Sequence, residues 1–301
     1  MPCLEVNNIF KSYADIDAVK DISFSVEYGE IFGLLGPNGA GKTTTIRMLL
    51  DIIKPDKGDV KVFGKGFSEE IKAEVGYLPE ERGLYENLTI MENILYIASL
   101  KGMNEKKARE NALALLEKVG LKEFGNKRLK FLSKGMRQLV QLIATMVPEP
   151  KLLILDEPFS GLDPDNRETV KKIILGQKSP DRTIILSTHL MNEFEEMCNR
   201  VLMINHGRRV LYGEIADIKE RYAKNCIYLE FAGNLPELKG LEKIKQEKTS
   251  AELYLRIDTT PRDILKQLAS KKVDVKKFDV TEMSLNEIFI ELVEAERWIK
   301  A

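Results

Sequence analysis

The sequence predicts an α/β domain over residues 1–222, followed by a small α+β domain over residues 223–301. Three observations favour this division. Short β-like runs alternate with helical periods from residue 4 to about residue 220. Four of those runs are continuously apolar, as strands are when both faces of a mainly parallel sheet are covered. Beyond about residue 224, apolar and polar positions alternate, which is typical of strands with one exposed face. The four apolar runs span residues 31–35, 152–155, 184–186 and 201–204.

Local signals place further elements of the first domain. The alternation over Ile22–Val26 predicts a half-exposed strand. Residues from about 85 to 150 have a helical pattern, within which Asn104 is suited to cap a helix that ends at Gly120. The apolar residues of that helix share one face. They are Ala108, Ala112, Leu115, Leu116 and Val119.

The second domain shows its own strand and helix signals. Apolar residues alternate at 227, 229 and 231 and again at 253, 255 and 257, and residues 273–280 also read as a strand. Thr260 followed by Pro261 predicts a short helix. Ser284 and Glu287 form a capping box that predicts the start of a final helix.

The composition excludes several classes of protein. The chain has 46 Lys and Arg against 47 Asp and Glu, so we expect no nucleic-acid partner. No apolar run reaches the ~18–20 residues of a membrane helix, and no signal-peptide pattern opens the sequence. The three cysteines lack metal-ligand spacing, which favours reduced thiols and a cytoplasmic setting.

The strongest motif is the phosphate-binding loop G-x-x-x-x-G-K-[ST]. Its eight residues are Gly36, Pro37, Asn38, Gly39, Ala40, Gly41, Lys42 and Thr43. The glycines let backbone N–H groups converge on phosphate oxygens, and the helical run that begins at Thr44 points its positive end at the same anion. Lys42 is suited to reach the β- and γ-phosphates, and the Thr43 hydroxyl to bind Mg²⁺. The motif therefore predicts ATP and Mg²⁺ as cofactors.

Two further strand ends carry candidate catalytic groups. Asp156 and Glu157 end the apolar run from residue 152, where an open α/β sheet places its ligand. Asp156 is a candidate Mg²⁺ ligand, and Glu157 is a candidate to polarise the attacking water. His189 follows another apolar run and is a candidate hydrogen-bond partner of the γ-phosphate or of the water. His206 lies in a turn, and we interpret it as structural.

The order of these motifs resembles the ABC ATPases. Between the phosphate loop and Asp156 lies the segment Leu132-Ser133-Lys134-Gly135-Met136, and the segment Ser160-Gly161-Leu162-Asp163 precedes His189. The resemblance covers about residues 4–220 and implies a P-loop NTPase core, in which a mixed sheet carries a helical subdomain at about 85–150.

The resemblance also implies roles for four more residues. Tyr13 corresponds to the aromatic side chain that stacks on adenine. Ser133 and Gly135 correspond to the signature segment, which contacts the nucleotide held by a second subunit. Asp163 corresponds to the residue that links the two sites. A head-to-tail dimer, formed with an identical chain or a paralogue, is therefore expected.

This sequence departs from the family pattern at two places. The signature usually reads Leu-Ser-Gly-Gly-Gln, but Lys134 and Met136 replace a glycine and the glutamine. Glu80 stands where the family usually has a glutamine that senses Mg²⁺ and the membrane partner, so we expect Glu80 to be a metal ligand. Such variants resemble the sodium- and drug-efflux branch, as does the run Met283–Phe289 of its accessory domain.

The resemblance implies an ATP-hydrolysing subunit of an ABC exporter, which powers a separate membrane-spanning channel and lies on the inner face of the cell membrane. A soluble ABC ATPase that acts on ribosomes or DNA is the alternative. Such proteins usually join two ATPase units or carry long coiled coils, and this chain shows one unit and no heptad tract. A P-loop GTPase or kinase would leave the signature segment unexplained.

Overall fold

The computed structural model describes residues 1–81, 83–190, 194–222, 226–256, 258–281 and 283–299. The chain forms two compact units, Met1–Glu214 and Ile215–Ala301. The sequence placed the boundary after residue 222. Helix α8 (Ile215–Tyr222) accounts for the difference, because it belongs to the second unit, where it contacts helix α10 (Leu285–Ile299).

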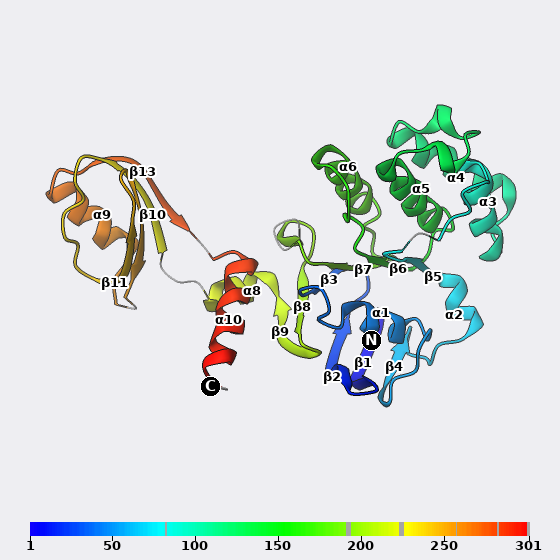
Figure 1. Ribbon diagram of the computed structural model, residues 1–301, viewed down its shortest axis with the longest axis horizontal. Helices are drawn as coiled ribbons and strands as arrows, with labels where there is room; N and C mark the ends of the chain where they lie inside the picture. Colours follow the sequence, from blue (N-terminus) through cyan, green and yellow to red (C-terminus); the bar gives the residue numbers. More distant parts are fainter. Residues whose placement is uncertain (82, 191–193, 223–225, 257, 282, 300–301) are drawn as a thin grey trace. The chain divides into compact units, whose positions relative to one another are not determined.

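The first unit is built on a six-stranded sheet in the order β5-β6-β7-β3-β8-β9 (Figure 1). Five strands are parallel, and β9 is antiparallel to β8, so the predicted mixed sheet is confirmed. All four continuously apolar runs lie in this sheet, and every residue of three of these strands, β3, β6 and β7, is buried. The strands are β5 (Val75–Leu78), β6 (Leu152–Asp156), β7 (Thr183–Thr188), β3 (Ile31–Leu35), β8 (Arg200–Asn205) and β9 (Arg208–Glu214).

A second sheet of the same unit has the antiparallel order β2-β1-β4. Its strands are β1 (Leu4–Tyr13), β2 (Ile16–Val26) and β4 (Lys57–Val62). The alternation predicted for the end of β2 is confirmed, since Ile22, Phe24 and Val26 are buried and the two serines between them are partly exposed. Helix α1 (Lys42–Leu49) contacts β2 and β4 of this sheet and β6 of the central sheet. Buried side chains of the helix and of both sheets pack in one apolar core. Each fully buried aliphatic side chain there contributes about 1.5–3 kcal/mol, which fixes α1 and the loop before it.

Three helices, α3, α4 and α5, contact one another and lie beside β5 and β6 (Figure 1). The predicted cap of α4 is confirmed, because the Asn104 side chain accepts a hydrogen bond from the Lys106 N–H at 2.9 Å. The apolar face of α4 buries Ala108, Ala112 and Leu116. The helical elements of the first unit other than α1 are α2 (Glu69–Glu74), α3 (Ile90–Leu100), α4 (Glu105–Lys118), η1 (Lys122–Phe124), η2 (Leu129–Phe131), α5 (Lys134–Met146) and α6 (Pro164–Leu175).

The second unit contains an antiparallel sheet in the order β11-β12-β10-β13. The predicted alternation in β10 is confirmed, since Ile227, Leu229 and Phe231 are buried and pack with Ile264 and Leu268 of α9. Both predicted helix starts are also found. Thr260 caps α9 in a capping box, and the Ser284 N–H donates to Glu287 Oε2 at 2.8 Å. Residue 257 lies outside the described residues. The remaining elements are β10 (Cys226–Ala232), β11 (Leu241–Gln246), β12 (Ser250–Leu255), α9 (Pro261–Ser270) and β13 (Asp274–Thr281).

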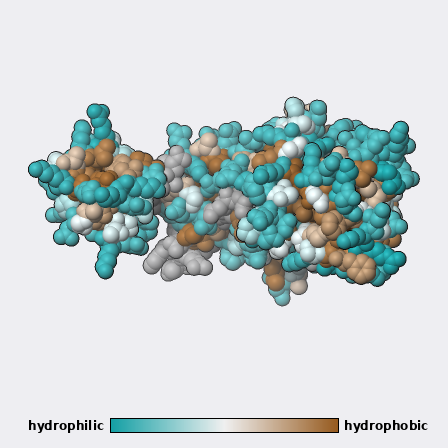
Figure 2. Space-filling model, turned by 90° about the horizontal axis from the view of Figure 1, so that it is seen from above, coloured by the Kyte–Doolittle hydropathy of each residue, from teal (hydrophilic) through white to brown (hydrophobic). Residues whose placement is uncertain are grey.

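Hydrophilic residues cover most of the face shown in Figure 2, where hydrophobic residues appear as separate patches. Within the described ranges, no helix combines the length and apolarity that crossing a membrane requires.

Candidate nucleotide-binding site

The phosphate loop joins β3 to α1. Gly41, the residue directly before α1, has a φ of 109°, and a Cβ atom there would lie 2.4 Å from the Ala18 carbonyl oxygen, so only glycine fits. The first turn of α1 contains no acidic residue. The positive end of the helix dipole and its free N–H groups are therefore available to an anion.

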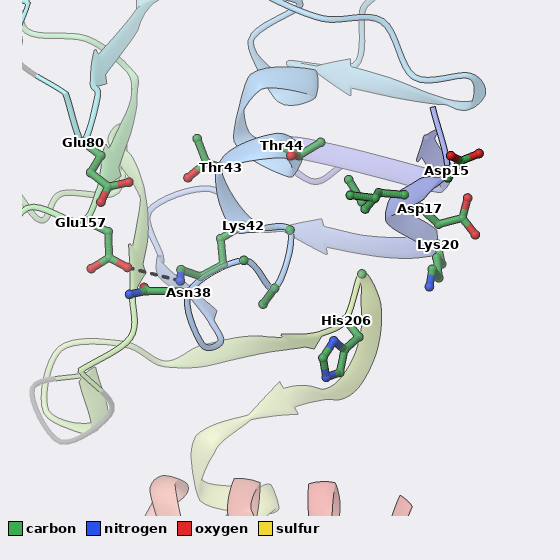
Figure 3. A pocket seen from close by; sticks show the side chains of 16 residues that line it. Asp15, Asp17, Lys20, Asn38, Lys42, Thr43, Thr44, Glu80, Glu157 and His206 are labelled. Carbon is green, nitrogen blue, oxygen red and sulfur yellow. Dashed lines mark ion pairs between the residues drawn. The ribbon is translucent and has the colours of Figure 1, made fainter. Parts of the chain in front are cut away.

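A cavity of about 520 Å³ opens along this loop (Figure 3). Glu80 and Glu157 lie at one end of it, Asp17 and Lys20 lie at the other, and Lys42 lies between them. The structure thus brings together most of the loop residues predicted to bind nucleotide and two of the predicted carboxylates. The cavity is lined by residues 15–18, Lys20, residues 38–44, Glu80, Glu157, His206 and Gly207.

Lys42 and Glu157 form a buried ion pair across this cavity. Lys42 Nζ lies 3.3 Å from Glu157 Oε1, and their side chains are 6% and 5% exposed. The same ammonium donates a hydrogen bond to the Gly36 carbonyl oxygen at 2.8 Å. Lys42 therefore connects the phosphate loop to the strand end that carries the candidate water-activating residue.

Glu157 has a backbone conformation that is costly for a residue with a side chain. Its φ is 50°, and its N–H donates to the Ser187 carbonyl oxygen at 3.1 Å, which holds this conformation in place. Glu157 Oε2 contacts His189 Nδ1 at 2.9 Å and accepts a hydrogen bond from the Thr188 hydroxyl at 3.2 Å. The three predicted catalytic residues, Lys42, Glu157 and His189, therefore form one continuous chain, although His189 does not line the cavity.

Asp156 is fully buried beside this chain. The Ser187 hydroxyl donates a hydrogen bond to Oδ1, while Oδ2 has no hydrogen-bond partner within the described part of the chain. Burial raises the pKa of the Asp156 carboxyl, and the nearby Ser187 and Thr43 hydroxyls oppose that rise. A buried carboxylate oxygen without a donor is suited to a hard cation, so this position fits Mg²⁺. Among the described residues, no group of three or more His, Cys, Asp or Glu side chains could hold a metal ion.

The predicted signature residues, Ser133 and Gly135, and the predicted linking residue, Asp163, lie at two helix starts that do not line the cavity. Ser133 is exposed, and its hydroxyl caps α5 by accepting from the Met136 N–H at 3.2 Å. Asp163 caps α6 by accepting from the Asn166 N–H at 3.0 Å. Gly135 in the first turn of α5 lies close to α6, because a Cβ atom on it would lie 3.2 Å from Asn166 Nδ2. The three residues form one surface cluster.

Tyr13 ends β1 with 46% of its surface exposed and does not line the cavity, although residues 15–18 directly after it do. Sequence reasoning missed those residues, Lys20 and Gly207, and assigned His206 a structural role only. These cavity residues lie in turns and near the start of a strand, and no sequence motif marks them. The only available signal was Asn205-His206-Gly207, a turn sequence between two strands.

Comparison with known proteins agrees with this geometry. A family model described as ABC transporter matches residues 19–160, and a model of the C-terminal domain of DrrA1-3-like ATP-binding proteins matches residues 213–293. The second match begins close to the boundary between the two structural units.

Two curated relatives and one solved structure show how far the similarity extends. An uncharacterized ABC transporter ATP-binding protein of Bacillus subtilis, YhaQ, is 36% identical over 295 residues, which cover 97% of this chain and 99% of the relative. The Nod factor export ATP-binding protein I of a Rhizobium species is 34% identical, covering 89% of this chain and 90% of the relative. A solved ATP-binding subunit of an ABC transporter aligns with a TM-score of 0.68 and 31% identity, over 73% of this chain and 93% of that structure.

Proposed function

Because this chain belongs to the ABC transporter ATP-binding proteins, which hydrolyse ATP to power transport, we propose that it drives an exporter with a separate membrane-spanning subunit. The Lys42–Glu157–His189 chain beside the phosphate loop carries the assignment of the ATPase site. Support for export comes from the similarity to the Nod factor export protein.

In the proposed site, the phosphate loop binds the triphosphate of ATP through its backbone N–H groups and Lys42. The Thr43 hydroxyl, Asp156 and Glu80 would hold Mg²⁺, which would supply positive charge against the phosphates of ATP. Glu157 accepts hydrogen bonds from the attacking water and orients it toward the γ-phosphate. His189 Nδ1 contacts Glu157, which leaves Nε2 on the opposite side of the ring for the γ-phosphate or the water.

The site is completed by a second subunit in this proposal. Ser133 and Asp163 are exposed and Gly135 is half-buried, and the cluster of these three residues does not line the chain's own cavity. The cluster includes the N-terminus of α5, which has no acidic residue in its first turn. A phosphate held by a second copy in a head-to-tail dimer would meet that N-terminus and the Ser133 hydroxyl.

The membrane partner is tested by reconstitution. We expect the tagged chain to co-purify from detergent-solubilised membranes with a protein of several apolar spans, and we expect that protein to stimulate ATP hydrolysis in liposomes. Co-purification with ribosomes, without such a protein, would contradict the proposal and support the soluble alternative.

Glu80 gives a prediction about Mg²⁺. A carboxylate binds a hard cation more firmly than an amide carbonyl does, and without metal its charge repels the γ-phosphate. Glu80→Gln is therefore expected to retain substantial hydrolysis with a flatter dependence on free Mg²⁺, and Glu80→Ala to lose stimulation by the membrane partner. ATPase rates titrated against free Mg²⁺ decide this. Three superimposable curves, from wild type and both variants, would mean that Glu80 never meets the metal.

The second unit gives a prediction about domain independence. Every residue that lines the cavity or is proposed for the site lies before residue 208, and the structural boundary follows Glu214. A chain ending at Glu214 is expected to fold and to bind ATP, with changed dimer formation or changed coupling to the membrane partner. Circular dichroism and ATP titration of the shortened chain test this. A folded but non-binding product would refute the two-domain interpretation.

A further inference from the structure

The turn between β8 and β9 lines the nucleotide cavity, although no motif marks it. His206 and Gly207 are its two central residues, with φ angles of 47° and 75°. Two consecutive positive φ values are typical of the type I′ turn of a tight hairpin. The His206 side chain is exposed at the cavity, while Gly207 is buried.

Gly207 packs closely between the phosphate loop and β2. Its N–H donates to the Ala40 carbonyl oxygen at 2.9 Å, and its carbonyl oxygen accepts from the Lys20 N–H at 2.7 Å. A Cβ atom on residue 207 would lie 2.8 Å from the Ala18 carbonyl oxygen. The turn therefore holds the phosphate loop in place through the Ala40 carbonyl group, while the N–H groups of the loop remain directed at the phosphates.

We propose that this turn is part of the nucleotide site: Gly207 is a positioning residue for the phosphate loop, and the His206 imidazole binds the nucleoside part of ATP. The inference rests on the proposed function. In Figure 3 His206 lies on the far side of the loop from Glu80 and Glu157, which mark the γ-phosphate end. A ring nitrogen there can exchange a hydrogen bond with a sugar hydroxyl or a base edge.

The chain contains a matched control for Gly207. Phe63 and Gly64 form a second two-residue turn with φ angles of 52° and 75°, closed by the Val62–Lys65 bridge. A Cβ atom on Gly64 would meet nothing within 4 Å. Alanine at either glycine introduces the same backbone strain, but only alanine at 207 pushes against the elements that hold the phosphate loop.

Two ligands separate the two roles, because Mg-ADP contacts both ends of the site and inorganic tripolyphosphate contacts only the phosphate loop. Gly207→Ala is expected to weaken both about tenfold or more, and to raise KM for ATP more than it lowers kcat. Gly64→Ala is expected to stay within about twofold for both. His206→Ala is expected to weaken the affinity for ADP about fivefold and to leave the affinity for tripolyphosphate unchanged.

Arg208→Ala is the control for His206→Ala. It changes an exposed side chain on the same hairpin outside the cavity lining, and it is expected to change neither affinity.

Isothermal titration calorimetry on the full chain, with thermal unfolding of each variant, gives the answer. Equal losses in the two glycine variants, or an unchanged ADP affinity in His206→Ala, would overturn the inference. If Gly207→Ala does not fold, the soluble His206→Ala variant still tests it through the ratio of the two affinities. Wild-type protein that binds neither ligand would instead refute the proposed function.

Discussion

Replacement of Glu157 by glutamine is expected to slow ATP hydrolysis by about 10²–10⁴-fold while ATP remains bound. The amide has nearly the size of the carboxylate, but it is neutral and a much weaker base toward the attacking water. The loss of charge also removes the partner of Lys42 in a buried pair with 3.3 Å between the charged atoms. Lys42 is then free to contact phosphate oxygens, so ATP affinity is expected to hold or to rise.

Phosphate release at saturating ATP, together with equilibrium ATP binding, checks this expectation. Size-exclusion chromatography is expected to show an ATP-bound dimer accumulating in the Glu157→Gln variant. Glu80→Gln is the matched control, since both carboxylates line the same cavity and only Glu157 contacts Lys42 and His189. Unchanged turnover in Glu157→Gln would remove Glu157 from the mechanism.

Replacement of Lys42 by alanine is expected to abolish ATP binding within its own subunit. Hydrogen bonds to charged groups contribute about 1.5–3 kcal/mol each, so loss of the ammonium is expected to weaken binding at least about 100-fold. The substitution also leaves the buried Glu157 carboxylate without its ion pair beside the phosphates, which adds repulsion. Calorimetric titration with ATP, with circular dichroism to confirm folding, measures the loss. Near-wild-type affinity would refute the assignment of the phosphate loop.

The parts of the site that sequence reasoning predicted are contiguous motifs next to apolar strands. The phosphate loop follows β3, and Asp156 and Glu157 end β6, so the strand pattern alone places both at one edge of the sheet. The same logic predicted His189 at the end of β7. Its contact with Glu157 depends on the pairing of β6 with β7 and on the positive φ of Glu157, which no local pattern specifies.

The outer wall of the cavity could not be predicted, because it comes from tertiary packing. Residues 15–18 form the end of the β1–β2 turn and the start of β2 in the antiparallel sheet, whereas His206 and Gly207 lie in a hairpin of the central sheet about 190 residues later. Only the packing of one sheet against the other brings them to the phosphate loop. The domain boundary differs for a similar reason. Helix α8 contacts α10, about 65 residues further along the chain, and it belongs to the second unit, which no local pattern specifies.

Ser133 distinguishes a shared site from a site within one chain. Its hydroxyl caps α5 and does not line the cavity of its own subunit. Ser133→Ala is therefore expected to keep ATP affinity in the monomer and to lose turnover, because the proposed contact is made across the dimer. Loss of the cap costs about 1 kcal/mol of stability, which thermal unfolding separates from the loss of activity.

Mixing the Lys42→Ala and Ser133→Ala variants tests the central claim most directly. In a head-to-tail heterodimer, one site would carry both substitutions and the other site neither. The mixture is therefore expected to recover ATPase activity that neither variant has alone, with the recovery rising with the fraction of heterodimer. A mixture as inactive as its parents, at concentrations where wild-type chains dimerise, would contradict a site shared between two copies of this chain.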